Sequence, residues 1–306
     1  MDGGWDVIGD VHGRCGALRA LLARLGYAET DGVFRHPVRR ALFIGDLVDR
    51  GPDVGGVLRI VRAMVAAGAA RAILGNHEYN VLCRRNDLAR GGQVARPRCR
   101  MNPQKTREMA PTMTALDAEP RFEAWLLGLP IWLELGGARF IHAYWGARVM
   151  ATLRGRPTLR ECGWDDRAFP QSELGRAVDR VLKGPEIDLP ADLCVVDRHG
   201  TPRSNARVAW WKPRPKGVSF NDVLVAPLDQ LVDRPLGDDQ FDTYEPYPPD
   251  APPVFIGHYG FDGPPGLLAS NVACVDYGHH NGGDAGIGVY RWTGERRLSG
   301  QGFRLP

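Results

Sequence analysis

The chain has 306 residues, and 43% of them are hydrophobic, enough to fill one large core or two ordinary ones. Its 39 Lys and Arg residues nearly balance its 36 Asp and Glu residues, and a net charge of +3 is too small to indicate a nucleic-acid partner. The six cysteines form no CxxC pair, which excludes a zinc-finger spacing and a dense disulfide framework.

The N-terminal third alternates short apolar runs with helical patterns. Trp5 to Gly9 is predicted to be a strand, and Gly16 to Leu25 a helix, because four leucines fall on one helical face. A strand, a helix and a strand follow at Ala41 to Gly45, Val54 to Ala67 and Arg71 to Leu74. Short buried strands between helices predict a mostly parallel sheet covered by helices.

The segment from Arg84 to Pro111 is rich in arginine and has few large apolar residues, so we predict a loop or a poorly packed excursion that flanks the functional site. Arg154 to Pro252 contains many prolines and few helical pieces, such as Ser172 to Lys183. We interpret the whole chain, residues 1–306, as a single domain with substrate-shaping insertions at about 84–111 and 150–252.

After residue 131 the sequence pattern predicts mainly strands. Trp132 to Leu135 and Ala138 to His142 flank a Gly-Gly turn and predict a hairpin that ends on a histidine. Further strands are expected at Pro253 to Gly257, just before His258, and at Val272 to Val275 and Gly286 to Trp292, with a turn at Gly278 to Gly283.

We expect neither a secretory signal at the N-terminus nor a membrane span. The N-terminus lacks the charged, apolar and cleavage-site regions of a secretory signal, and no apolar run is long enough to span a bilayer. We therefore expect a cytoplasmic protein without a membrane partner.

Polar residues with metal-binding side chains recur at the predicted strand ends. They are Asp10, His12, Asp46, Asn76, His142 and His258. Ligands of such sheets bind at the carboxyl ends of the strands, so these side chains are expected to meet. Each phrase alone is also compatible with a turn or a helix cap, but their occurrence together favours a metal site.

The composition of this ligand set limits which metal ions it suits. Two carboxylates, one amide oxygen and three imidazoles suit Mn, Fe, Zn, Co or Ni better than a magnesium-only or calcium site. Because one aspartate can bridge two ions, six residues suffice for a pair. Two ions about 3.5–4 Å apart can hold a bridging hydroxide as nucleophile and clamp a phosphoryl group, which predicts hydrolysis of phosphate esters.

Five phrases resemble those of the calcineurin-like metallophosphoesterases, in the branch that contains serine/threonine phosphoprotein phosphatases and bacterial diadenosine tetraphosphatases. They are Gly9-Asp10-Val11-His12-Gly13, Gly45-Asp46-Leu47-Val48-Asp49-Arg50-Gly51, Gly75-Asn76-His77-Glu78, Ile141-His142-Ala143 and Gly257-His258, in the same order as in the family. A weaker match spans Asn271 to Gly283. The resemblance implies an α/β fold, a four-layer α/β/β/α sandwich of two mixed sheets with a dinuclear metal site at strand ends.

The resemblance also implies a role for each matched residue. One divalent ion, with manganese expected, would be held by Asp10, His12 and Asp46, and the other by Asp46, Asn76, His142 and His258. His77 would be the general acid, Asp49 would orient it, and Arg50 would bind the phosphate.

The chain departs from the family pattern in two places. His142-Ala143-Tyr144-Trp145 replaces the usual His-Ala-Gly and is expected to reshape the rim of the site. Lys216 stands before Gly217-Val218-Ser219-Phe220, where the protein phosphatases have a second phosphate-binding arginine. Lys216 is therefore a candidate second phosphate ligand, with Arg207 and Arg214 as competitors.

The sequence thus predicts a metallophosphoesterase with two divalent ions that cleaves phosphomonoesters of a small metabolite, a nucleotide or a phosphoprotein. Two alternatives stay open: a dinucleoside polyphosphate hydrolase, and a non-catalytic metal-binding scaffold. The pairs Tyr144-Trp145 and Trp210-Trp211 would suit stacking on a nucleobase, although aromatic residues of this kind also fill cores.

Overall fold

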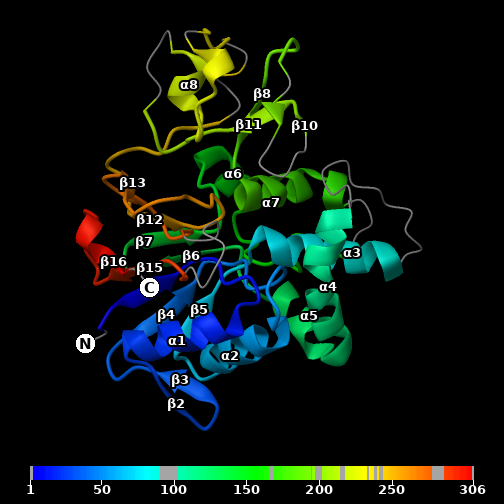
Figure 1. Cartoon of the computed structure of the whole chain (residues 1–306), viewed down its shortest axis with the longest axis vertical. Helices are drawn as coiled ribbons and strands as arrows, with labels where there is room; N and C mark the ends of the chain where they lie inside the picture. Colours follow the sequence, from blue (N-terminus) through cyan, green and yellow to red (C-terminus); the bar gives the residue numbers. More distant parts are fainter. Residues whose placement is uncertain are drawn as a thin grey trace.

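The computed structural model describes residues 3–89, 103–165, 169–193, 195–196, 202–213, 218–232, 234–237, 240, 244–277 and 286–304. In these ranges two five-stranded sheets lie face to face between layers of helices (Figure 1). The turn expected at Gly278 to Gly283 lies outside the described residues.

The first sheet has the strand order β16-β15-β1-β4-β5. Its parallel strands are β1 (Trp5–Ile8), β4 (Arg40–Phe43) and β5 (Ala70–Ala72). β15 (Val289–Trp292) pairs antiparallel with β1, and β16 (Phe303–Arg304) with β15. The sheet is therefore mixed, because the C-terminal strands return to the edge beside β1.

The second sheet has the order β13-β14-β12-β7-β6. Its three parallel strands are β7 (Ala138–Ile141), β12 (Val254–Ile256) and β14 (Val272–Cys274). The antiparallel edge strands are β6 (Trp132–Leu135) and β13 (Leu267–Ala269). β6 and β7 form the predicted hairpin.

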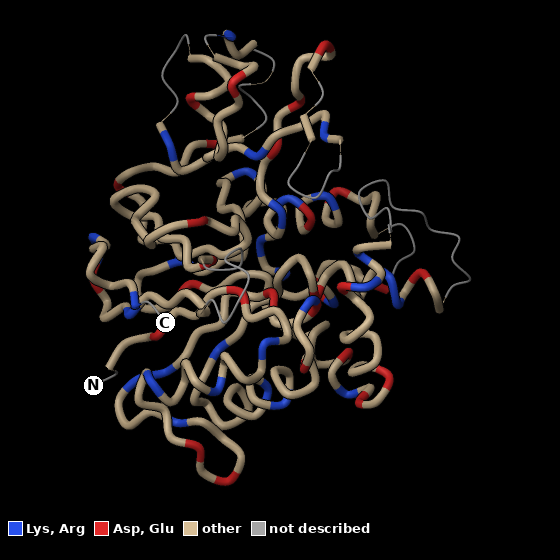
Figure 2. Tube along the Cα trace, in the orientation of Figure 1, with Lys and Arg blue, Asp and Glu red and all other residues tan. Residues whose placement is uncertain are grey.

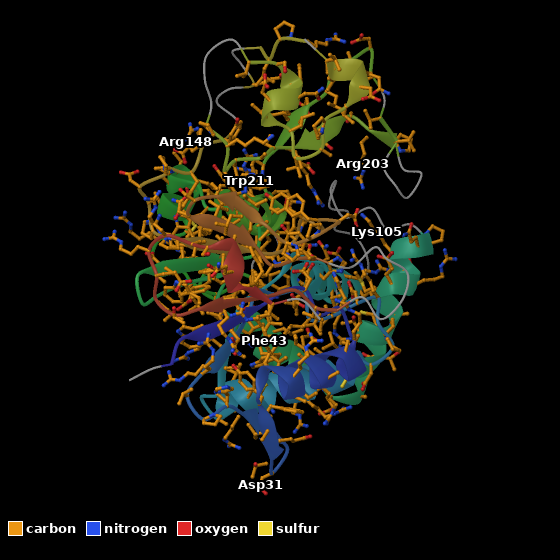
Figure 3. All side chains as sticks on the ribbon, turned by 60° about the vertical axis from the view of Figure 1, so that its left-hand side comes forward. Asp31, Phe43, Lys105, Arg148, Arg203 and Trp211 are labelled. Atoms are coloured by element: carbon orange, nitrogen blue, oxygen red, sulfur yellow. The ribbon has the colours of Figure 1, made fainter. Side chains whose placement is uncertain are left out.

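The two sheets share a core that follows strand alternation. Leu42 of β4 belongs to the cluster between the sheets, with Phe140 and Phe255, whose rings stack at 5.2 Å. Phe43, one residue later, belongs to the core on the helix side (Figure 3). Successive strand residues point to opposite faces, so both faces of each central strand are apolar.

Helices complete the four layers (Figure 1). α1 (Cys15–Leu25) and α2 (Val54–Ala66) lie below the first sheet, and α6 (Ala147–Thr152) and α7 (Glu173–Lys183) lie above the second. The predicted α/β/β/α sandwich of two mixed sheets is confirmed. Basic and acidic residues are interspersed along the trace (Figure 2), in keeping with the small net charge.

The prediction of a loop from Arg84 to Pro111 is wrong where the structure describes it. α3 (Asn76–Ala89) and α4 (Pro103–Ala118) cover residues 84–89 and 103–111, and 90–102 are not described. α4 is polar because it buries only a narrow stripe, made of Met109, Thr112 and Leu116 at helical spacing. α3 and α4 pack against α5 (Arg121–Leu127).

The remaining elements are short. β2 (Ala28–Thr30) and β3 (Val33–Arg35) form a hairpin below α2, and single turns occur at η1 (Phe169–Gln171), η2 (Asp229–Leu231) and η3 (Gly300–Gly302). Above α7, β8 (Glu186–Asp188) pairs with β11 (Asn205–Arg207), β9 (Val195–Val196) pairs with β10 (Pro202–Arg203), and α8 (Phe220–Val223) lies nearby. We call these five elements the upper lobe. None of the helices in the described ranges combines the length and apolar character that a membrane crossing requires.

Candidate metal centre

The predicted ligands meet at the carboxyl ends of strands from both sheets. Asp46, which follows β4, lies at the centre: its Oδ2 is 3.8 Å from His12 Nε2, and its Oδ1 is 3.4 Å from His142 Nε2. Two groups of side chains have ligand atoms within 4.8 Å of one another, one made of His12, Asp46 and His77, the other of Asp10, Asp46 and His142. Asp46 belongs to both, which is the position that a bridging carboxylate requires.

Backbone strain is concentrated at these residues. Among the described residues, non-glycine residues with positive φ are His12, Asp31, Asp46, Asp49, Arg50 and His258, and all but Asp31 are candidate site residues. Left-handed conformations are costly for residues with a Cβ and persist where the surrounding structure enforces them. The strand ends therefore turn sharply in order to aim these side chains at one point.

Two glycines allow the loops that carry the ligands to pass close together. A Cβ on Gly75 would lie 2.2 Å from the backbone nitrogen of Asp46, and one on Gly45 would lie 2.6 Å from Gly75. No larger residue fits at either position without moving the loop that carries Asp46.

The hydrogen bonds of two histidines fix their tautomers. His142 Nδ1 lies 2.7 Å from the carbonyl oxygen of Ile44, and His12 Nδ1 lies 3.0 Å from that of Val48. A carbonyl oxygen only accepts, so in each neutral ring the proton is on Nδ1 and the lone pair is on Nε2. Both Nε2 atoms face the carboxylate of Asp46, and a metal ion is the partner that such converging lone pairs suit.

Asn76 and His258 extend this arrangement. Asn76 Oδ1 lies 2.9 Å from His142 Nε2 and 2.6 Å from His258 Nδ1, at the start of α3. Burial, and then the nearby charge of Arg207, lower the pKa of His258 well below its ordinary value, so its ring is neutral. An amide oxygen and two imidazole nitrogens thus point at one position, a donor set that suits a borderline divalent ion.

The pKa values of the two candidate carboxylate ligands, Asp10 and Asp46, depend on burial and on neighbouring charges. Burial raises the pKa of Asp10 well above its usual range, and the charges of Asp276 and Asp46 raise it further. Burial alone would also raise the pKa of Asp46, but His142 and His77 hold it well below its usual range. A divalent ion beside Asp10 would offset both burial and like-charge repulsion, so the residues present fit the expected metal.

His77 and Asp49 form a dyad beside these ligands. His77 Nδ1 lies 2.7 Å from Asp49 Oδ2, and Asp49 is held in turn by Thr112 of α4, whose hydroxyl donates to Asp49 Oδ1 at 2.5 Å. Burial lowers the pKa of His77, but Asp46 and Asp49 outweigh it and raise the pKa above the ordinary value. The His77 ring is therefore suited to carry and deliver a proton.

Arg50 lies between the dyad and the ligands. Its Nη1 is 3.0 Å from His12 Nε2, its Nη2 is 3.4 Å from His77 Nε2, and its backbone N–H donates to the carbonyl of Glu108 at 2.8 Å. Thr112 and Glu108 both belong to α4, so the helix that the sequence analysis missed supports the loop carrying Asp49 and Arg50.

Glu78 is a further site residue to which the sequence analysis assigned no role. Its Oε2 accepts from the backbone N–H groups of Asp46 at 2.9 Å and Gly75 at 2.8 Å, and its Oε1 from Leu47 at 2.7 Å and Val48 at 3.1 Å. Glu78 joins the loop after β4 to the start of α3. The available signal was its place three residues after Gly75, the spacing of a capping box.

Other predicted positions turn out differently. Lys216 and Arg214 lie outside the described residues, whereas Arg207 is described and exposed. The interpretation that Tyr144-Trp145 and Trp210-Trp211 stack on a nucleobase is wrong, because all four side chains are buried. Trp210 packs edge-on against Tyr144, Trp211 and Tyr247, so the aromatic rings form core.

Fold and site together define an α/β/β/α protein with a candidate metal centre at the strand ends. A sequence model of the calcineurin-like phosphoesterases matches residues 6–258, and the chain belongs to this family. Members of the family depend on divalent metal ions, in agreement with the ligand groups around Asp46.

Curated relatives match shorter parts of the chain. The asymmetrical bis(5'-nucleosyl)-tetraphosphatase PrpE of Halalkalibacterium halodurans is 46% identical over 74 residues, which cover 24% of this chain and 30% of the relative. The protein of the same name from Geobacillus thermodenitrificans is 33% identical over 160 residues, covering 52% and 56%. The chain thus spans less than two thirds of either relative's length.

Solved structures show the same fold. The cold-active protein-tyrosine phosphatase of a psychrophile, Shewanella sp., aligns with a TM-score of 0.53 at 15% identity, over 97% of this chain and 80% of the other. At this identity the likeness concerns the fold alone.

Proposed function

We propose that the chain hydrolyses phosphate esters at a centre of two divalent ions. The observation that carries the proposal is the convergence of acceptor atoms: the Nε2 lone pairs of His12 and His142 both face the shared carboxylate of Asp46. Two ions held there by Asp10, His12, Asp46, Asn76, His142 and His258 would activate a water molecule and polarise the phosphoryl oxygens.

The chain's own residues supply the rest of the reaction. Arg50, whose fork reaches both His12 and His77, would hold the phosphoryl oxygens. His77 would donate its proton to the departing oxygen, and Asp49, hydrogen-bonded to Nδ1, would fix the ring and stabilise its protonated form. His77 also lies 3.8 Å from Asp46, so the test must separate an acid from a ligand.

A second candidate, hydrolysis of dinucleoside polyphosphates, is favoured by the curated relatives, whose names specify bis(5'-nucleosyl)-tetraphosphatases. Phosphomonoesters of a small metabolite, a nucleotide or a phosphoprotein are the first candidates from the sequence. A scaffold without activity is disfavoured, because the ligands, the dyad and Arg50 are all assembled.

We also assign finer properties as proposals. Manganese is the expected metal, since the mixed oxygen and imidazole ligand set suits it. A cytoplasmic location is supported by the described cysteines Cys15, Cys83, Cys162 and Cys274, which are buried free thiols. The chain would act as one domain, and residues 84–111 and 150–252, with Lys216 among them, would shape substrate access.

A panel assay tests the proposal. The manganese-loaded full chain is incubated with p-nitrophenyl phosphate, bis-p-nitrophenyl phosphate, AMP, a phosphopeptide and diadenosine tetraphosphate, with Asp46→Asn as the control. Metal-dependent release of product from at least one substrate, lost in Asp46→Asn, is expected. No turnover of any of them by a protein with bound metal would leave the scaffold as the surviving alternative.

A further inference from the structure

We propose that Arg207 binds an anionic group of the substrate outside the phosphoryl group held at the metal centre. The centre would then favour substrates with two or more linked phosphoryl groups over simple monoesters. The inference rests on the proposed function and specifies the substrate class of that same site.

Backbone contacts fix the position of Arg207. It is the last residue of β11, where it lies opposite Glu186 of β8 in the antiparallel register. Its carbonyl oxygen accepts the backbone N–H of Val225 at 3.0 Å. The side chain therefore leaves the upper lobe from a defined point.

The guanidinium group lies against a rigid aromatic ring. Arg207 Cζ is 6.0 Å from the centroid of the Tyr259 ring. The Tyr259 hydroxyl donates to the carbonyl of Ala143 at 3.1 Å and accepts from Trp210 Nε1 at 2.9 Å, and the Trp211 ring (labelled in Figure 3) packs edge-on at 5.0 Å. A cation on the face of a fixed ring loses less freedom when it binds a ligand.

This ring is next to the metal ligands. Tyr259 follows His258 directly, and the two ring centroids are 5.5 Å apart. His258 in turn lies 2.6 Å from Asn76 Oδ1. One aromatic ring thus separates the guanidinium group from a ligand of the proposed centre.

The charge of Arg207 is not neutralised within the described part of the chain. No described carboxylate forms an ion pair with it, and this includes Glu186 across the register. Arg234, a half-buried arginine beyond α8, instead binds both oxygens of Asp192 at 2.9 and 3.0 Å. An exposed arginine alone is ordinary; one fixed beside a metal centre without a carboxylate suits a phosphate oxygen.

Arg50 and Arg207 occupy different sides of the ligand set. Arg50 directly contacts His12 and His77, so it reaches the phosphoryl group at the metals. Arg207 lies on the His258 side, and the Tyr259 ring stands between its guanidinium group and the His258 ring. The two cations therefore suit two different phosphoryl groups of one substrate.

The test compares two substrates in matched variants of the manganese-loaded full chain. Arg207→Ala should lower the ratio of kcat/KM for diadenosine tetraphosphate to that for p-nitrophenyl phosphate by about 10- to 100-fold, the loss of one charge-assisted contact. Arg207→Lys should recover part of the ratio. Arg234→Ala, which removes the same charge elsewhere, should leave it unchanged.

Calorimetric binding of diadenosine tetraphosphate, with manganese in excess in both solutions, separates this inference from the proposed function. If the wild-type chain hydrolyses neither substrate, the proposed function fails, yet at least tenfold weaker binding by Arg207→Ala still supports the anion site. An unchanged ratio with unchanged binding overturns the inference. So does an equal loss for both substrates, because Arg207 would then act on the scissile phosphoryl group or on the fold.

Discussion

The carboxylate of Glu78 holds the backbone of Asp46: Glu78 Oε2 accepts the Asp46 N–H at 2.9 Å. The same side chain accepts from Gly75, Leu47 and Val48, and it is fully buried. The backbone of Asp46, the carboxylate that we propose as the bridge between the two ions, is therefore held by a side chain of α3 that is not itself a proposed ligand.

Glu78→Gln should weaken manganese binding by about 10- to 100-fold, because the amide nitrogen of Gln is a donor and would face backbone N–H groups. Titration with manganese, followed by calorimetry, measures the effect. Glu29→Gln, an exposed change of the same kind, serves as control. An unaltered manganese affinity in a folded Glu78→Gln protein would show that the hydrogen bonds of Glu78 do not position Asp46.

Asp46→Asn should remove both ions, since Asp46 belongs to both ligand groups. His258→Ala should remove one, because the ring that the change deletes adjoins Asn76, whereas the contact of His258 with Asp10 is made by its backbone N–H and is kept. Metal content per chain, measured after gel filtration, distinguishes the two variants. Equal metal loss in both would contradict a shared carboxylate.

His77→Asn should lower kcat by about 100- to 10,000-fold while metal content stays at the wild-type level, as expected when a general acid is lost. The loss should be larger for an alkyl phosphate than for p-nitrophenyl phosphate, whose leaving group needs little protonation. Asp49→Asn, which removes the partner of His77 Nδ1, should act in the same direction. Loss of bound metal in His77→Asn would instead identify His77 as a ligand.

Asp6→Asn should destabilise the chain by about 3–5 kcal/mol, because it breaks a buried ion cluster. Asp6 Oδ1 accepts from Arg39 and Arg291, each at 3.0 Å, and Asp6 is fully buried. Urea unfolding gives the free energy, and manganese affinity should not change. Glu29→Gln breaks only the exposed pair with Arg19 and should cost about 1 kcal/mol or less. Equal effects of the two changes would refute the assignment of stability to this cluster.

Much of the fold follows from local patterns. Leu18, Leu21, Leu22 and Leu25 repeat at helical spacing and are buried in α1, and the short apolar runs became the central strands of both sheets. α4 was missed because it buries only a narrow stripe of residues. A sequence pattern predicts a helix from its buried apolar residues, and α4 has too few of them.

The sequence by itself determined which residues stand at the strand ends, because apolar runs followed by Asp, Asn or His mark those ends in the chain. Only the tertiary structure decided which neighbours support them. Thr112 meets Asp49 from a helix 63 residues away, and Arg207 reaches the Tyr259 ring from the upper lobe. The buried Trp210 likewise gained its partners only on folding. Spacing along the chain carries no information about which distant surfaces pack together, and packing sets these contacts.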